Sequence, residues 1–398
     1  MKSLIKIAMT LVLLTSILKA QDTKLDGYLR SGKLQDGLNA FAKPANDADR
    51  FSLAVLQTLQ GVQQFSDGAS KLGIKQTLGR SLPFFRIQAP AQPAGTPVEV
   101  ATPEKIRALF TNLRESLKKA NATLAKVGDT DFKVQVNLSQ AYLDNKDGTP
   151  AMPLTGSLSN IMGLRTASEQ DIVVNFDSAD AAWLKGYTHL LTGMIEIFMA
   201  YDWSPVWNQM AYLLFTSPNP MPPLAKYAVS GQGQGPSDWA DMIAAVHELR
   251  LEVKDPEGLK RALVEFRSMI ACSRVCWTRV LAETDDDLEW LPSPKQKGPR
   301  GATITQAQID GWTAVLNELD AILAGKKLLP HWRIINGMGI NVARLVQNPP
   351  KLDLVLMVQG SAFIPYIENG DVSDSTRWQQ LMAPFGRGGF MSFALWSN

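Results

Sequence analysis

Apolar side chains recur at intervals of three and four residues along most of this chain, as expected of amphipathic helices. The most apolar stretch is Asp177–Trp203, in which apolar residues surround the helix axis almost completely. Such a helix either lies buried in the middle of a domain or crosses a membrane. Lys185, His189 and Glu196 lie within it, and ionisable groups are rare and costly in lipid. The pattern therefore predicts a buried central helix.

Other stretches with the same period are predicted as further helices. They are Asp22–Phe41, Phe51–Val62, Pro103–Lys126, Trp207–Phe215, Trp239–Leu249, Pro256–Leu281 and Ile309–Leu323. Two of them have sharp start signals. Asp255 is an N-cap acid that precedes a proline at the first helical position, and Thr305 with Gln308 fits a capping box. Gly325 is expected to end the last of these helices as a C-cap.

The segments between these helices are predicted as extended or irregular. Phe132–Leu143 alternates apolar and polar residues and is predicted as a short strand, whereas Ser168–Phe176 is predicted as a short helix. Leu352–Gln359 suits a helix, although its apolar run also suits a strand. Gly386–Trp396 is predicted as extended, and Ser217–Pro236, rich in Pro, Gly and Ser, as a long loop without regular structure. The predicted fold class is mainly α, a multi-helix globular bundle with minor β content.

The first residues have the pattern of an export signal. MKSLIKIAMTLVLLTSILKAQ has a short positive region, an apolar run over Ile7–Leu18 that is too short to span a bilayer comfortably, and a small residue at Ala20. This predicts a signal peptide over residues 1–20 and a periplasmic or secreted protein. Retention of the segment as an N-terminal anchor stays open, because Leu18 and Lys19 are not ideal beside a cleavage point.

After the leader, the patterns divide the chain into three parts: an N-terminal helical hairpin region over 21–81, a Pro/Ala-rich connection over 82–103 and a main helical domain over 104–398. The segment YLRSGKLQDGLNAFAKPANDADRFSLAVLQTLQG resembles one tetratricopeptide helical hairpin. No second copy follows at the expected period, and solenoids need about three repeats to be stable. The resemblance therefore implies a single docked hairpin.

The charge of the chain argues against a nucleic-acid partner. The chain has 40 Lys and Arg and 38 Asp and Glu, and the leader holds three of the lysines and no acid. The mature chain thus carries 37 basic and 38 acidic residues, which is close to neutral. A nucleic-acid-binding protein is expected to have a marked basic excess.

The two cysteines, Cys272 and Cys276, lie one turn apart within a predicted helix. A disulfide along one helix would be strained, and a metal centre needs more ligands than two. Both are therefore predicted as small core residues.

A polar stripe on the central helix is the first candidate site. Lys185, His189, Thr192 and Glu196 follow at spacings of four, three and four residues and therefore share one face. Glu196 could raise the pKa of His189 or hold its tautomer, and the group could line a pocket. The alternative is that the two satisfy each other, or meet Arg side chains of neighbouring helices, and have no chemical role.

The second candidate is an acidic run with four carboxylates in five residues: Asp285, Asp286, Asp287 and Glu289. Such a run could hold a hard cation such as calcium through oxygen ligands, although its spacing is not that of an EF-hand. Adjacent acids also repel one another and commonly point to water. Lys295 and Lys297 follow closely and could neutralise them.

Catalytic and cofactor motifs are absent from the sequence. His247 begins a pattern like that of a zinc-protease helix, but Leu251 stands where the second histidine is required. There is no Gly-x-Ser-x-Gly elbow, no phosphate loop and no dinucleotide fingerprint. No cofactor is predicted, apart from the possibility of calcium.

The leader, the hairpin, AWLKGYTHLL, AYDW and AETDDDLEWLPSPKQ together resemble a group of exported bacterial proteins of unknown function. The resemblance spans most of the mature chain. It implies export and a helical fold, and it transfers no catalytic residue.

These features lead to one main hypothesis and two alternatives. The main one is a non-enzymatic binding or structural protein of the cell envelope, with another envelope protein or a peptide as its partner and no membrane span beyond the leader. The first alternative is an envelope hydrolase that uses His189 with Glu196. The second is a calcium-stabilised scaffold that uses the acidic run beginning at Asp285.

Overall fold

The protein is mainly α-helical with minor β content, as the sequence predicts. The computed structural model describes residues 24–75, 96–143, 154, 171–227, 236–386 and 389–397. The predicted leader and most of the predicted connection lie outside the described residues. Strands among these residues form small two-stranded sheets, so the helices determine the architecture.

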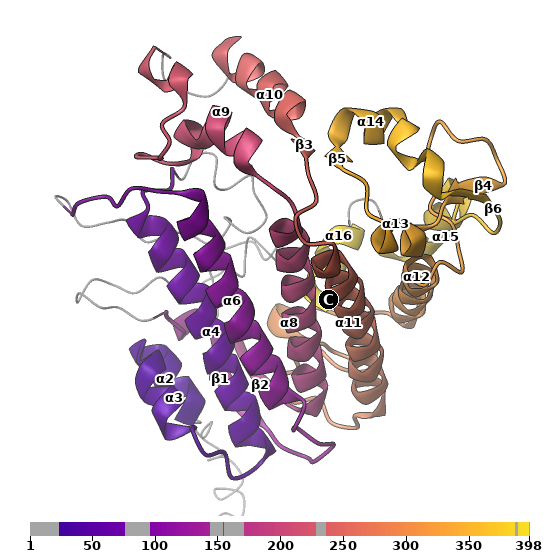
Figure 1. Cartoon of the computed structure of the whole chain (residues 1–398). Coiled ribbons are helices and arrows are strands. Elements are labelled where there is room, and N and C mark those ends of the chain that lie inside the picture. Colours follow the sequence, from indigo (N-terminus) through magenta and orange to yellow (C-terminus); the bar gives the residue numbers. More distant parts are fainter. Residues whose placement is uncertain are drawn as a thin grey trace, which may run out of the picture.

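Four long helices lie side by side at the centre of the molecule (Figure 1). They are α4 (Asp47–Lys71), α6 (Pro103–Leu124), α8 (Ser178–Ala200) and α11 (Pro256–Ala282). Their close approach depends on glycines: a Cβ added at Gly61 of α4 would lie 2.6 Å from Ser116 of α6. One added at Gly193 of α8 would lie 2.9 Å from the ring of Phe266 on α11.

The predicted central helix is confirmed as α8, which packs against both α6 and α11. Asp177 is its N-cap and forms a capping box with Asp180, so the helix begins one residue later than the stretch identified from the sequence. Ile195 is fully buried, in a cluster with Phe110 of α6. In the part of the chain that the structure describes, no helix is both long enough and apolar enough to cross a bilayer.

The N-terminal region differs from its prediction in one respect. The single helix expected over Asp22–Phe41 is two helices, α2 (Lys24–Ser31) and α3 (Leu34–Ala40), separated at Gly32 with a φ of 65°. Glycine adopts this left-handed conformation readily, so it can end a helix. The next helix, α4, is capped by the side chain of Asn46, which accepts from the main-chain nitrogen of Asp49.

The strand predicted within Phe132–Leu143 is confirmed as β1 (Val134–Asn137). It pairs antiparallel with β2 (Val173–Phe176), and Val134 faces Phe176 in the register. The helix predicted over Ser168–Phe176 is therefore wrong in its described part. The β-branched residues of β2 are largely buried, and pairing with β1 outweighs the helical spacing of three apolar positions.

The chain after α8 continues through α9 (Ser204–Leu214), the 3-10 turn η3 (Pro223–Lys226) and α10 (Pro236–Glu248). The prediction of a structureless loop over Ser217–Pro236 missed one short regular element in the described part of this segment, the turn η3. Besides η3, the main-chain nitrogen of Asn219 donates to the carbonyl of Ala101, which ties this segment to the start of α6.

The C-terminal third follows α11 and begins with the turn η4 (Pro299–Gly301) and helix α12 (Gln306–Leu323), whose predicted capping box is confirmed. The predicted C-cap Gly325 has a φ of 71°. The later elements are β4 (Met338–Ile340), α13 (Val342–Gln347), β5 (Leu352–Asp353), α14 (Leu354–Gln359), η5 (Ser361–Tyr366), β6 (Ile367–Asn369), α15 (Ser375–Met382), η6 (Ala383–Phe385) and α16 (Gly389–Ser397). Strand β5 pairs with β3 (Arg250–Leu251), and β4 pairs with β6.

The extended conformation predicted for Gly386–Trp396 is wrong, because most of this segment is helix α16. Phe393 of α16 stacks on Trp277 of α11, with ring centroids 6.0 Å apart. The indole of Trp183 on α8 donates to the carbonyl of Trp396 at 2.7 Å. Burial against two central helices therefore stabilises a helix that local pattern did not indicate.

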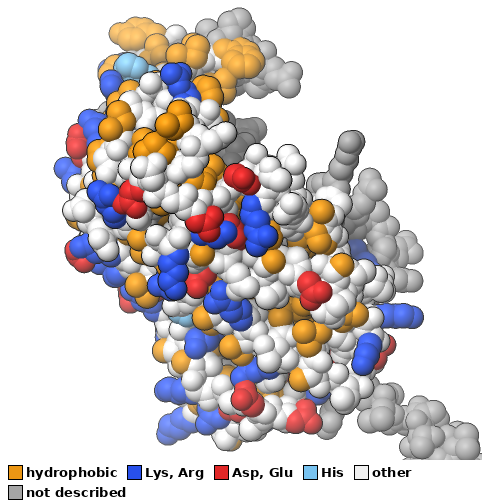
Figure 2. Space-filling view, turned by 90° about the vertical axis from the view of Figure 1, so that its right-hand side faces the viewer, with side chains coloured by type: hydrophobic (Ala, Val, Ile, Leu, Met, Phe, Trp, Pro, Cys, Tyr) orange, Lys and Arg blue, Asp and Glu red, His pale blue; other side chains and the backbone are white. Residues whose placement is uncertain are grey.

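Helix α10 leaves its apolar face exposed to solvent. On α10, Trp239, Met242, Ile243 and Val246 follow at helical spacing and are all exposed, with Trp239 and Ile243 at 64% and 68%. Figure 1 places α10 at the upper end of the molecule, and Figure 2 shows hydrophobic side chains gathered at that end. An exposed apolar face of this kind commonly marks an interaction surface.

Candidate metal centre

Helices α8 and α11 run antiparallel, and this brings the start of one to the end of the other. Near one end, the carboxylate of Glu196 on α8 bonds Arg261 of α11; near the opposite end, Arg279 donates to the carbonyl of Ser178 at 2.7 Å. Asp177, the N-cap of α8, and Glu283, the residue after α11, therefore lie close together.

Asp177 is oriented by its capping role. Its Oδ1 accepts hydrogen bonds from the main-chain nitrogens of Ala179 at 2.7 Å and Asp180 at 3.4 Å. These bonds satisfy main-chain donors that have no partner within the helix, and they hold the side chain in one position. A carboxylate has two oxygens, so the cap leaves Oδ2 for other contacts.

The loop after α11 folds back and supplies a third acid. The main-chain nitrogen of Asn175 on β2 donates to the carbonyl of Leu288 at 3.0 Å. Trp290 packs against Trp183 and Phe176, with ring centroids 5.5 and 6.0 Å apart. These contacts on both sides of Glu289 place it in the interior, where it is only 2% exposed.

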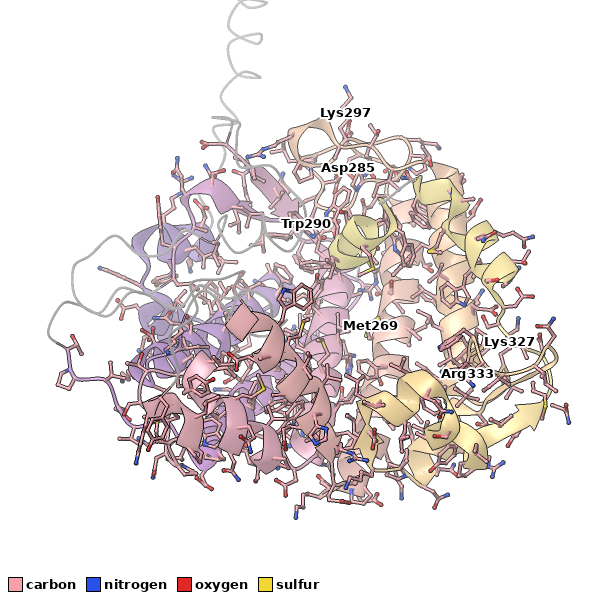
Figure 3. All side chains as sticks on the ribbon, turned by 90° about the horizontal axis from the view of Figure 1, so that it is seen from above. Met269, Asp285, Trp290, Lys297, Lys327 and Arg333 are labelled. Carbon is pink, nitrogen blue, oxygen red and sulfur yellow. The ribbon has the colours of Figure 1, made fainter. Side chains whose placement is uncertain are left out.

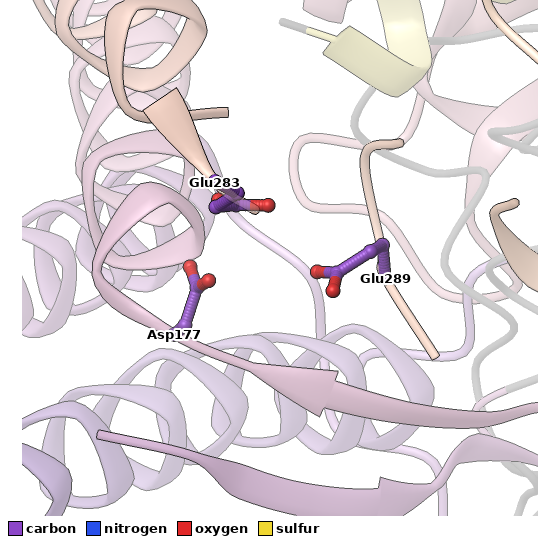
Figure 4. A group of neighbouring side chains, drawn as sticks. All are labelled: Asp177, Glu283 and Glu289. Carbon is purple, nitrogen blue, oxygen red and sulfur yellow. The ribbon is translucent and has the colours of Figure 1, made fainter. Parts of the chain in front are cut away.

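Asp177, Glu283 and Glu289 converge on one small volume (Figure 4). One carboxylate oxygen from each lies within 4.8 Å of the other two. The three residues come from different segments, namely the β2–α8 junction, the end of α11 and the following loop. We call this set the carboxylate cluster.

The charge of the carboxylate cluster is only partly balanced. Burial and the neighbouring charge of Asp177 raise the pKa of Glu283 from 4.5 to about 8. Burial likewise raises the pKa of Glu289, and it raises that of the adjacent buried Asp180 well above its ordinary value. Among the described residues, the cation paired with the cluster is Lys133, whose Nζ lies 3.7 Å from Glu289.

A neighbouring amide orients the cluster. Gln296, which is buried, donates through Nε2 to Glu283 at 3.1 Å and to the main-chain carbonyl of Asp285 at 2.7 Å. Its Oε1 accepts from the main-chain nitrogen of Ser293 at 2.7 Å. Gln296 therefore links the loop to Glu283 and restricts the position of that carboxyl group.

Three carboxylates with this arrangement suit a hard cation. Calcium takes about six to eight oxygen ligands, from carboxylates, carbonyls and water, at about 2.3–2.6 Å. Zinc and other softer metals prefer histidine nitrogen and cysteine sulfur, which the carboxylate cluster does not offer. A cation here would also take the place of the protons that keep neighbouring buried acids neutral.

Of the four acids predicted from the sequence, only Glu289 belongs to the carboxylate cluster. Asp285, Asp286 and Asp287 are exposed; Asp285 bonds Lys133 at 2.8 Å, and Asp286 accepts from the main-chain nitrogen of Lys297 at 2.9 Å. Figure 3 shows Asp285 and Lys297 toward the rim of the molecule and Trp290 nearer the helices. The three aspartates thus lie on the solvent-exposed side of the loop.

Sequence reasoning missed Asp177 and Glu283. Both were available as acids at helix ends, and Asp177 opens the stretch from which the central helix was predicted. Their distance from Glu289 in space depends on the antiparallel packing of two helices, which no local pattern contains. The sequence therefore indicated the loop that supplies Glu289 but not the two other residues of the carboxylate cluster.

The polar stripe on α8 does not form one pocket. Glu196 is 1% exposed and is bonded by Arg261 at 2.8 Å and by Arg114 at 3.4 Å. His189 bonds Glu265 of α11 and not Glu196, so the pairing expected from the sequence is wrong. Thr192 is buried, and Lys185 is half-buried. The alternative of arginine partners on neighbouring helices describes Glu196 correctly.

No family model matches the chain, and none of the curated proteins or solved structures that were compared is similar to it.

Proposed function

We propose that this chain is an exported structural or binding protein of the cell envelope. We further propose that its carboxylate cluster binds a hard divalent cation, with calcium favoured over magnesium. The observation that carries the proposal is the convergence of three carboxylate oxygens within 4.8 Å in a largely buried setting. It moves the calcium hypothesis from the exposed aspartates to Asp177, Glu283 and Glu289.

Calcium is favoured over magnesium because the ligands come from three different segments of the chain and are not arranged as a regular octahedron. Magnesium demands near-ideal octahedral geometry at about 2.0–2.1 Å, whereas calcium accepts variable coordination and bidentate carboxylates. The carboxylate cluster draws its oxygens from a helix start, a helix end and a loop. Main-chain carbonyls and water would supply the remaining ligands.

The role of the cation would be structural. It would join the N-terminus of α8, the C-terminus of α11 and the loop after it, which meet only in the folded state. Glu283 also lies at the negative end of the α11 dipole, where a carboxylate is unfavourable and a cation is favourable. Binding to the folded state alone stabilises it by about 2.7 kcal/mol at about one hundred times the dissociation constant.

Export and partner binding rest on other features. The pattern of residues 1–20 supports export, and the near-neutral mature chain supports a partner other than nucleic acid. The exposed apolar face of α10 supports binding of another envelope protein, through an apolar helix or peptide segment that would cover Trp239 and Ile243.

Thermal unfolding of the leader-free protein tests the cation proposal. At about one hundred times the dissociation constant, we expect calcium to raise the midpoint over that in chelator by about 3 °C in a chain of this size. Glu289→Gln should abolish the rise, because it removes a ligand charge while keeping the side-chain shape. Asp286→Asn, in the exposed part of the same loop, should keep it. No rise in the unmodified protein, or an equal rise in Glu289→Gln, would contradict the proposal.

A further inference from the structure

Lys133 places a positive charge beside the carboxylate cluster. Its Nζ lies 2.8 Å from Asp285 and 3.8 Å from Asp287, on the exposed side of the loop, and 3.7 Å from Glu289 in the interior. Glu289 therefore belongs both to the carboxylate cluster and to the acids around this ammonium group. The ammonium group is itself a cation held by these acids, which shows that this part of the fold accommodates positive charge.

Strand pairing explains the position of Lys133. It directly precedes β1, in which Val134 faces Phe176 of β2. One further step in the same antiparallel register would bring Lys133 opposite Asp177, the N-cap of α8. Trp290 packs on Phe176, with ring centroids 6.0 Å apart, and this contact holds the loop after α11 against the same pair of strands. The fold therefore fixes the ammonium group next to the carboxylate cluster.

The ammonium group and a divalent cation compete for the same negative charge. Lys133 balances part of the charge of the buried Glu289, and its own charge repels a second cation that binds nearby. The Lys133 side chain is 31% exposed, and its two outer partners, Asp285 and Asp287, are each 52% exposed. Lys133 therefore keeps two carboxylate partners and access to water when a divalent cation takes Glu289.

We propose that Lys133 is a resident counter-cation, which holds the buried acids together in the absence of metal and lowers the affinity of the carboxylate cluster for a divalent cation. This inference rests on the proposed function and names how that same site is regulated. The affinity of calcium sites depends on the number of charged ligands, and dissociation constants of about 10⁻⁴–10⁻³ M are typical of extracellular modules. An adjacent ammonium charge moves the site toward this weaker range.

Calorimetric titration of the folded full-length protein with calcium chloride, at neutral pH and constant ionic strength, tests this inference. Lys133→Met removes the charge and keeps an unbranched side chain, and it should lower the calcium dissociation constant on the order of tenfold. Lys133→Arg keeps the charge and should bind calcium about as tightly as the unmodified protein. Lys297→Met is the matched control, because Lys297 is exposed on the same loop and its loss should change the affinity little.

A second pair of variants tests the same inference with the lysine in place. Asp285→Asn weakens the bond that draws the ammonium group to the outer side of the loop, so calcium binding should become weaker. Asp286→Asn removes an equal charge from an exposed residue that bonds the main-chain nitrogen of Lys297, and it should weaken binding less. In the Lys133→Met background the two aspartate variants should have equal effects, because no ammonium group remains to move.

The outcomes separate this inference from the proposed function. Equal calcium dissociation constants for the unmodified protein and Lys133→Met, or weaker binding in Lys133→Met, would overturn the counter-cation role alone. No calcium binding in any of these proteins would overturn both. If Lys133→Met folds only when calcium is present, as judged by far-UV circular dichroism, the metal replaces the ammonium group as expected. If it folds in neither condition, equal effects of Asp285→Asn and Asp286→Asn in the otherwise unmodified protein would overturn the inference.

Discussion

Asp177, the N-cap of α8, and Glu283, the residue that follows α11, bring a carboxylate oxygen each to within 4.8 Å of the other. Burial and the neighbouring charge of Asp177 raise the pKa of Glu283 to about 8, so its carboxyl group holds a proton at neutral pH. A divalent cation bound between them would replace that proton. The relationship exists only when α8 and α11 are packed together, so it couples protonation and cation binding to folding.

The first prediction concerns pH. Without a cation, the pKa of Glu283 rises on folding from 4.5 to about 8, so its contribution to stability is lost as pH increases through this window. Cation ligands must be deprotonated, and calcium should therefore stabilise the protein more at about pH 8.5 than at about pH 5.5. Thermal midpoints with calcium and with chelator at both pH values measure this. A calcium effect that shrinks as pH rises would contradict it.

The second prediction separates the two roles of Asp177. Asn is as good an N-cap as Asp, so Asp177→Asn should leave the calcium-free stability within about 0.5 kcal/mol while removing the response to calcium. Asp177→Ala should lose the cap as well, at a cost of about 1 kcal/mol. Urea unfolding of the three proteins in chelator and in calcium distinguishes these outcomes. A full calcium response in Asp177→Asn would exclude this residue as a ligand.

The third prediction concerns the buried ion pairs of Glu196. Glu196→Ala leaves Arg114 and Arg261 without their shared carboxylate. Breaking a buried pair costs about 3–5 kcal/mol, but Arg261 is 44% exposed and can turn to water, so a loss of about 2 kcal/mol is expected. Glu257→Ala removes the exposed pair with Lys260 and should change stability by less than about 0.5 kcal/mol. Equal losses in the two variants would contradict the burial argument.

The fourth prediction concerns the packing of α8 against α11. Gly193→Ala would place a Cβ 2.9 Å from the ring of Phe266, and overpacking of this kind costs about 1–3 kcal/mol. Gly27→Ala in α2 is the matched control, because its Cβ would meet nothing within 4 Å. The control should gain about 0.5–1 kcal/mol from the better helix propensity of Ala. Denaturant midpoints of both variants measure the difference, and a stabilised Gly193→Ala would refute the close approach.

The fifth prediction concerns His189 and stability. Its pKa rises on folding from 6.5 to about 9, so the pair with Glu265 contributes fully below about pH 6.5 and is lost as pH increases through about 9. His189→Gln should therefore destabilise the protein more at about pH 6 than at about pH 10. Unfolding midpoints of the two proteins across this range provide the measurement. A difference that is independent of pH would indicate packing alone.

Local signals in the sequence predicted most helices correctly. The proline after Asp255 and the Thr305–Gln308 capping box each act within one turn, so their effect is visible without any tertiary information. The failures lie where distant partners decide. Strand β2 exists because β1 pairs with it, and α16 is a helix whose Phe393 packs on Trp277 of α11.

By itself, the sequence determined a mainly helical protein with α8 at its centre, and it identified Glu289 and His189 as residues of interest. Tertiary structure alone decided their neighbours: Asp177 and Glu283 for Glu289, and Glu265 for His189. The physical reason is the range of the interactions. Helix propensity and capping depend on residues within about four positions, whereas convergence of side chains depends on the antiparallel packing of α8 on α11, which forms only with the whole core.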